Sequence, residues 1–328
     1  MSGDQCNLEH YTEQVVLFDG QAISFPLFEP HPAQSSLLAR GDATESFSAY
    51  LTSSIYDELY SYDNITGMPT DINGPIYLCF QNLFKIHPAF DSILIKILQT
   101  DEEGHIVLQA SRNYHKTLIV LDRIRDTVIN DVCPKVRKVC KDAKNILERI
   151  HFIPRVESDK MIFIFQQASL MLHPFPFGGS KTASDALKAG TPLVTYPQAY
   201  LRGRLASTFY TTMALHEIDM DVSSSKCCVA SDEIDFIQKA LKLGRDSTYR
   251  QKVSNAIKKR NHRIFDDIQT SFEWARFLTR ALGVVIDDNE LALKMKYHPK
   301  SWQEDSFVQD AFVKMQQRWK RSSMRTKT

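Results

Sequence analysis

The sequence has no long run of apolar residues, no signal segment and no strong net charge. Its longest apolar runs, such as residues 161–165, are far shorter than the roughly 20 residues that span a bilayer. Residues 1–5 carry neither the basic nor the apolar part of a signal peptide. The formal net charge is +1, so no overall field attracts nucleic acid or an anionic membrane. We therefore expect no nucleic-acid partner and no membrane association.

The six cysteines do not form a metal-binding pattern. None belongs to a C-x-x-C pair, which argues against a zinc site. Cys79 and Cys227 lie in strand-like runs, where a buried thiol is the usual state. The simplest interpretation is a reducing setting, which is cytoplasmic or nuclear.

Apolar segments that are typical of buried strands alternate with segments of helical periodicity. The strand-like segments are residues 76–80, 105–108, 150–153, 170–172, 193–195 and 226–230. Helices are expected between them, with Pro134 interrupting the long helical zone at residues 116–147, and at residues 232–243, 247–260 and 270–282. This alternation predicts an α/β fold with a doubly wound parallel sheet, and hydrophobic residues make up 43% of the chain, enough for a full core.

The composition divides the chain into four parts. Residues 74–285 are predicted to form one Rossmann-like domain, because the strand signals that alternate with helices lie there. Residues 27–73, rich in Pro, Ser, Asp and Tyr, are interpreted as an irregular linker. Residues 286–328 are interpreted as a basic C-terminal tail, with a solvated end as the simplest explanation of its charge. Residues 1–26 hold a separate strand-like stretch.

Residues 168–196 are predicted to form a strand, a loop, a helix and a second strand. Prolines and glycines end the first strand, Ser180 or Thr182 is placed to cap the helix, and Gly190 is placed for a left-handed end. Such a loop presents free backbone N–H groups and a helix dipole at the carboxyl edge of a parallel sheet. The stretch therefore predicts an anion-binding site.

Two motifs resemble a known family. The run D-A-L-K-A-G-T-P-L-V-T at residues 185–195 is close to the D-x-L-x-A-G-T-P-x-V-T of the protein O-GlcNAc transferase and SPINDLY group of GT-B glycosyltransferases. The run Q-N-L-F-K-I-H-P at residues 81–88 resembles that group's N-Q-L-Y-K-I-D-P. Residues 173–178, H-P-F-P-F-G, are similar to the bacterial cytoplasmic asparagine glucosyltransferases of the same superfamily. Residues 11–18 resemble the end of the N-terminal catalytic lobe, so residues 1–26 are interpreted as its remnant.

The resemblance implies a set of site residues. Lys85 is the catalytic candidate, because a fixed cation stabilises the charge that builds on a departing diphosphate. Thr182 and the loop N–H groups would donate to phosphate oxygens, Lys181 would add charge, and Asp185 would accept from ribose hydroxyls. The backbone of Val156 would hold an edge of the base. The donor-binding set is thus Asn82, Val156, Gly178, Gly179, Ser180, Lys181, Thr182 and Asp185.

The sequence departs from the family pattern at several of these positions. Asn82 stands where the family has glutamine, and Ser180 and Lys181 replace a histidine and a threonine. Ser158 and Met161 replace a lysine and a histidine near the base, so uridine and guanosine both stay open. No D-x-D motif follows a strand, so we expect no metal and no cofactor besides the donor substrate, UDP-GlcNAc or another nucleotide sugar.

The resemblance implies the donor-binding half of an enzyme that transfers GlcNAc, or a related hexose, to Ser or Thr of a protein acceptor. The alternatives are transfer of fucose from GDP-fucose, transfer of glucose from UDP-glucose to asparagine, and a non-catalytic module that binds nucleotide sugars. Residues 1–73 are too few for a second sheet with its covering helices. We therefore expect the chain alone to bind a nucleotide sugar but to transfer it poorly.

Overall fold

The computed structural model describes residues 74–135, 138–153, 155–156, 158–197, 201–215, 227–265, 267, 270, 273–274, 277–278 and 281–282. The predictions for residues 1–26, 27–73 and 286–328 therefore lie outside the described residues. Every strand lies in the compact unit Leu27–Ile264, whereas Phe265 and the described residues after it belong to another unit. In that second unit, the described positions 270, 273, 274, 277, 278 and 281 are helical, consistent with the helix predicted there.

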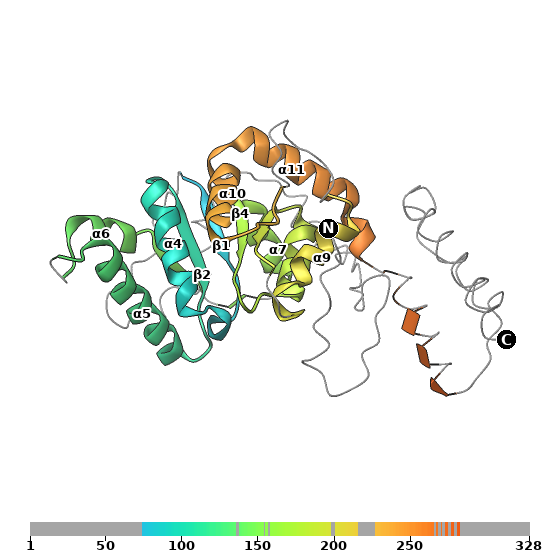
Figure 1. The fold of residues 1–328 in the computed structure, drawn as a ribbon, viewed down its shortest axis with the longest axis horizontal. Helices are drawn as coiled ribbons and strands as arrows, with labels where there is room; N and C mark the ends of the chain where they lie inside the picture. The colour runs from blue at the N-terminus through green and yellow to red at the C-terminus, as the bar shows by residue number, and fades with distance from the viewer. Residues whose placement is uncertain are drawn as a thin grey trace. The chain divides into compact units, whose positions relative to one another are not determined.

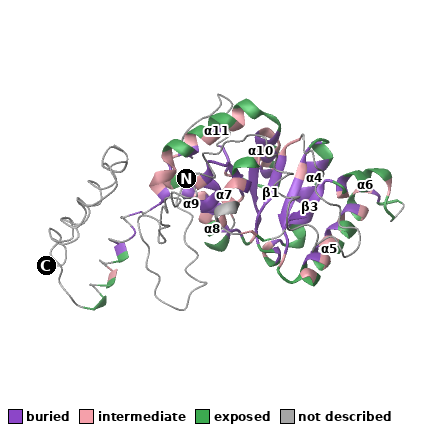
Figure 2. Ribbon diagram, turned by 180° about the vertical axis from the view of Figure 1, so that it is seen from behind, coloured by how far each residue is buried: buried purple, intermediate pink, exposed green. Residues whose placement is uncertain are grey.

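Five parallel strands form one sheet in the order β3-β2-β1-β4-β5 (Figure 1). They are β1 (Ile76–Cys79), β2 (His105–Gln109), β3 (Ile150–Ile153), β4 (Leu170–His173) and β5 (Leu193–Thr195). Nearly all of their side chains are buried, as Figure 2 shows for β1 and β3. Continuous apolar runs are what a sheet covered on both faces requires. The predicted doubly wound α/β fold is confirmed.

Helices connect and cover the strands. They are α4 (Pro88–Thr100), α5 (Tyr114–Val132), α6 (Lys141–Leu147), α7 (Ser158–Gln167), α8 (Lys181–Ala189), α9 (Leu205–Thr212), α10 (Glu233–Arg245) and α11 (Ser247–Arg260), with short 3-10 helices η2 (Leu83–Lys85), η3 (Leu201–Gly203) and η4 (Asn261–Ile264). The chain runs outward from β1 to β3 and then returns to β4 and β5. Because such crossovers are right-handed, α4, α5 and α6 cover one face and α7 and α8 the other. The direction reverses between β1 and β4, which is where sheets of this kind open a crevice.

Local chemistry explains where several helices begin and end. The side chains of Asp232 and Asp246 accept hydrogen bonds from the first turns of α10 and α11, as N-caps do. Gly190 ends α8 with φ of 82°, the left-handed conformation expected there. Helix α5 ends at Val132, two residues before Pro134, so the predicted interruption is confirmed.

A buried arginine and an aromatic cluster connect helices to the two edges of the sheet. Arg149 donates to the backbone oxygens of Leu98, Asp101 and Gly104 at 2.8, 2.7 and 3.0 Å. This contact joins the end of α4 to the start of β3. Phe90, Phe175 and Phe236 meet edge to face, with centroids 5.2 to 5.8 Å apart. They pack α4 and α10 against the loop that follows β4.

The sixth strand predicted at residues 226–230 is not formed by the described residues 227–230. Val229 makes a single parallel bridge to Thr195 at the edge of β5. The Thr195 N–H donates to Cys228 O at 2.9 Å, and the Ala230 N–H donates to Thr195 O at 2.8 Å. Cys228 has φ of 76°, which interrupts the extended backbone that a strand needs.

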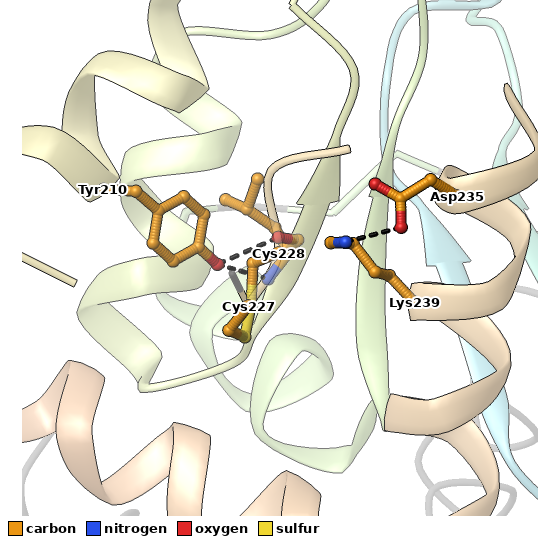
Figure 3. The surroundings of a disulfide bond; sticks show 6 residues. Tyr210, Cys227, Cys228, Asp235 and Lys239 are labelled. Carbon is orange, nitrogen blue, oxygen red and sulfur yellow. Dashed lines mark hydrogen bonds and ion pairs between the residues drawn. A yellow bond between two sulfur atoms is a disulfide. The ribbon is translucent and has the colours of Figure 1, made fainter. Parts of the chain in front are cut away.

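Four cysteines are paired. Cys133–Cys140 joins the end of α5 to the start of α6, and Cys227–Cys228 links neighbouring residues. Figure 3 shows the second disulfide beside Tyr210, whose hydroxyl donates to Leu193 O at 2.9 Å. Cys79 is a buried free thiol as predicted, but the prediction of a free thiol at Cys227 is wrong. The cysteines give no support to a reducing setting, so a cytoplasmic or nuclear location stays a prediction.

Candidate functional site

Two loops meet at the crevice between β1 and β4. One follows β1 and carries η2, and the other leads from β4 into α8. Lys85 at the end of η2 reaches across, with its Nζ 3.5 Å from Gly178 O and 4.8 Å from the ring centroid of Phe177. Partial burial lowers the pKa of the Lys85 ammonium from its ordinary value. The structure therefore places a half-buried cation beside the loop that was predicted to bind an anion.

Two glycines let that loop lie close to its neighbours. A Cβ atom on Gly178 would come within 1.8 Å of the His173 ring, and one on Gly179 within 2.0 Å of the Gln81 amide. Both glycines are buried. A larger residue at position 178 would have to push the loop away from His173 at the end of β4, whereas one at position 179 would displace the Gln81 amide and Thr182 Oγ1.

Within the described part of the chain, backbone donors at the start of α8 have no acceptor. The first turn closes with the Ser184 N–H donating to Ser180 O at 2.9 Å, so the N–H groups of Lys181, Thr182 and Ala183 precede any turn of the helix. Ser180 occupies the N-cap position, but its side chain makes no cap hydrogen bond. Thr182 Oγ1 instead accepts from the Gln81 amide. The predicted side-chain cap is thus wrong, and the N–H groups stay available to a ligand.

His173 is a site residue that the sequence reasoning missed. It is 1% exposed at the end of β4, with Nε2 2.9 Å from Gly179 O and Nδ1 3.0 Å from Thr195 Oγ1. A carbonyl oxygen only accepts, so Nε2 carries the proton and Nδ1 accepts from the threonine hydroxyl. Burial lowers the pKa of His173 to about 4, which keeps it neutral near pH 7. His173 therefore fixes the peptide unit that joins Gly179 to Ser180.

Gln81, rather than Asn82, supplies the amide at the loop. Gln81 is 1% exposed and donates to Thr182 Oγ1, whereas Asn82 is exposed and precedes η2. The signal in the sequence was a pair of amides after a buried strand, in transposed order relative to the family motif. Only the backbone direction after β1 decides which one turns inward.

Asp185 lies one turn into α8 and is 5% exposed. Its Oδ1 forms an ion pair with Lys181, and its Oδ2 is buried with no hydrogen-bond partner in the described part of the chain. Lys181 therefore lies along the helix toward Asp185. Val156 follows β3, which β2 and β1 separate from β4, and it is half-exposed. The structure thus groups Lys85, Gly178, Gly179, Ser180, Lys181, Thr182 and Asp185, but it leaves Val156 and Asn82 outside this group.

A cavity of about 710 Å³ adjoins Lys85 on the side of α4 and α5. Six cationic residues line it: Lys85, Arg112, Lys116, Arg123, Arg155 and Arg202. Among the described residues that line the cavity, none is Asp or Glu. The exposed rings of Phe84 and Phe177, with centroids 6.4 Å apart, belong to its wall.

In the described ranges, no group of three or more His, Cys, Asp or Glu side chains is arranged to hold a metal ion. No helix in the same ranges is both long and apolar enough to cross a membrane.

Comparisons with known proteins agree with the predicted resemblance. Residues 61–271 match glycosyl transferase family 41. Similar solved structures include a mutant O-GlcNAc transferase from Thermobaculum terrenum, with 20% identity, a TM-score of 0.47, and coverage of 62% of this chain and 34% of that chain. Sucrose-phosphate synthase from Thermosynechococcus elongatus has 12% identity, a TM-score of 0.44, and coverage of 65% and 47%. HepE of Anabaena in complex with UDP and glucose has 11% identity, a TM-score of 0.38, and coverage of 64% and 49%.

This chain thus spans between a third and a half of the length of those three structures. The family match covers well over half of this chain and includes both loops of the crevice. The chain therefore belongs to glycosyl transferase family 41.

Proposed function

We propose that the chain is the donor-binding half of a glycosyltransferase that transfers GlcNAc, or a related hexose, from a nucleotide sugar to Ser or Thr of a protein. The observation that carries this proposal is the position of Lys85. Its ammonium lies 3.5 Å from Gly178 O, in the loop that leads into α8, and no side chain caps the start of that helix in the described part of the chain. The two loops together offer a cation and a helix N-terminus to one anionic group.

This arrangement suits the departure of a diphosphate. When the anomeric C–O bond breaks, negative charge builds on the phosphate, and charge-stabilising groups that are already oriented lower the barrier. The N-terminal dipole of α8 and the N–H groups of Lys181 and Thr182 would act on the phosphate oxygens. Lys85 would act from the opposite side.

The remaining site residues would hold the nucleoside. Asp185 Oδ2 is a buried acceptor that lacks a donor in the described part of the chain, and a ribose hydroxyl would supply one. The Val156 backbone is proposed to hold a base edge after β3. The base, the sugar and the acceptor follow from the family resemblance, and fucosyl transfer and asparagine glucosylation stay alternatives. Binding of UDP against GDP tests the base.

Calorimetric titration with UDP, GDP and uridine in EDTA tests the donor site. UDP or GDP should bind with the chelator present, and Lys85→Ala should weaken diphosphate binding about tenfold to a hundredfold with little effect on uridine. Lys96→Ala, which removes an exposed lysine on α4, is the matched control. Loss of binding in EDTA would show that the metal-free account is wrong.

Transfer is tested with nucleotide sugars that carry a radiolabelled sugar. The chain alone should release free sugar slowly and label a protein extract weakly, because an acceptor must be held in line with the anomeric carbon. Strong protein labelling would show that these residues suffice for the full reaction. Donor binding without hydrolysis or transfer would favour the non-catalytic module.

A further inference from the structure

The cavity beside Lys85 concentrates positive charge in a nearly neutral protein. The whole chain has a formal net charge of +1, yet six cationic side chains line this one cavity, with no carboxylate among its described lining residues. Arg123, one of the six, forms a two-point ion pair with the buried Asp91 at 2.7 and 2.9 Å. The other five lie around the rest of the wall.

Three of these cations come from segments that the sheet order brings together. Arg112 lies in the loop after β2, Lys116 in the first turn of α5, and Arg155 directly after β3. All three are exposed, and no side chain in the described part of the chain forms an ion pair or hydrogen bond with them. Like charges that gather without counter-ions raise the local concentration of anions.

The cavity is separate from the loop proposed to bind the diphosphate. No residue of Gly178–Asp185 lines it, although Lys85 and Arg202 belong to its wall and both contact Gly178. Its wall includes Lys116, Ile119 and Val120 of α5, whereas α8 lies on the other face of the sheet. A group bound in the cavity would therefore lie next to the donor phosphates rather than in their place.

We propose that this cavity receives acidic side chains of the protein acceptor, close to the hydroxyl that is glycosylated. The inference rests on the proposed function, because only a transfer reaction brings an acceptor to this crevice. A volume of about 710 Å³ is within the usual range for ligand sites and admits two or three side chains. The apolar rings of Phe84 and Phe177 at the wall suit a large apolar residue between the acidic ones.

Two labelled peptides test this inference by fluorescence anisotropy. One is Glu-Glu-Leu-Ser-Glu-Glu, and the other is the same peptide with every Glu changed to Gln. The Glu peptide should bind the full chain at least tenfold more tightly than the Gln peptide at low salt, with the difference shrinking as salt rises. Equal binding of the two peptides would overturn the inference.

Variants locate the binding. Combining Arg112→Gln, Lys116→Gln and Arg155→Gln should weaken the Glu peptide about tenfold. The matched control combines Arg125→Gln, Lys141→Gln and Lys144→Gln, which removes the same charge from exposed positions outside the cavity. Equal losses in the two triple variants would show a non-specific charge effect and overturn the inference.

Titration with UDP separates this inference from the proposed function. Saturating UDP should leave the affinity for the Glu peptide unchanged or increase it. Displacement of the peptide by UDP would show that the cavity is part of the phosphate site, which overturns the inference and leaves the proposed function standing. Absence of any UDP or GDP binding would instead refute the proposed function.

Discussion

Acid should loosen the loop between β4 and α8 through His173. Burial lowers the pKa of this imidazole to about 4, whereas an unfolded chain has a pKa of about 6.5. Above pH 6.5 the side chain is neutral in both states, so its contribution to stability is fully present. Below pH 6.5, His173 binds a proton in the unfolded chain but not in the folded protein. The free energy of unfolding therefore falls until about pH 4. The difference of roughly 2.5 pKa units corresponds to a loss on the order of 3 kcal/mol.

Urea denaturation of the wild type and His173→Gln between pH 7.5 and 4.5 measures this effect. The variant should be less stable at pH 7.5 by about 1–3 kcal/mol, since it disturbs the hydrogen bonds to Gly179 and Thr195. Between pH 6 and 4.5, however, its stability should fall less steeply, by up to about 1.4 kcal/mol per pH unit. His151, whose pKa burial lowers to about 3, adds the same slope to both proteins and cancels in the difference. Parallel curves would refute the account of a neutral, buried His173.

Three further substitutions test the surroundings of the loop. Gly179→Ala should weaken UDP binding at least tenfold while lowering Tm by only a few degrees, because the new Cβ would lie 2.0 Å from the Gln81 amide and 2.4 Å from Thr182 Oγ1 and would displace these groups without disturbing the core. Calorimetry and thermal denaturation of one sample measure both effects, and unchanged affinity would contradict the prediction. Asp185→Asn should weaken the binding of uridine and of UDP by similar factors, since the carboxylate is proposed to accept a hydrogen bond from the ribose. A loss of affinity confined to UDP would argue against that role. Arg149→Met should lower the free energy of unfolding by about 2–4 kcal/mol in urea denaturation, because three buried carbonyl groups lose their donor, and a loss below about 1 kcal/mol would show that water replaces the guanidinium.

The sequence alone determined the fold class and most strand positions. Apolar runs such as residues 105–108 are local signals, and Gly190 and Pro134 act on the backbone through their own covalent geometry. The same short-range logic predicts that the loop before α8 binds an anion, and this stays a prediction. The family motifs added the roles of Lys85 and Asp185, which no periodicity contains, and these roles stay predictions.

Other features depended on contacts between distant segments. The strand expected at residues 226–230 is not formed, because Cys228 adopts a left-handed conformation. A cysteine in the sequence does not predict this conformation. The sequence did not predict that His173 is buried. Its burial depends on β5 and on the Gly179 carbonyl, which lie on either side of the ring.

The cationic cavity depends on strand order in the same way. Arg112, Arg155 and Lys85 are separated by 27 to 70 positions in the sequence, and they meet because β1, β2 and β3 are neighbours with their carboxyl ends at one edge. Residue patterns report the conformation of a few consecutive residues. The pairing of strands, which sets the chemistry at that edge, is a property of the packed sheet alone.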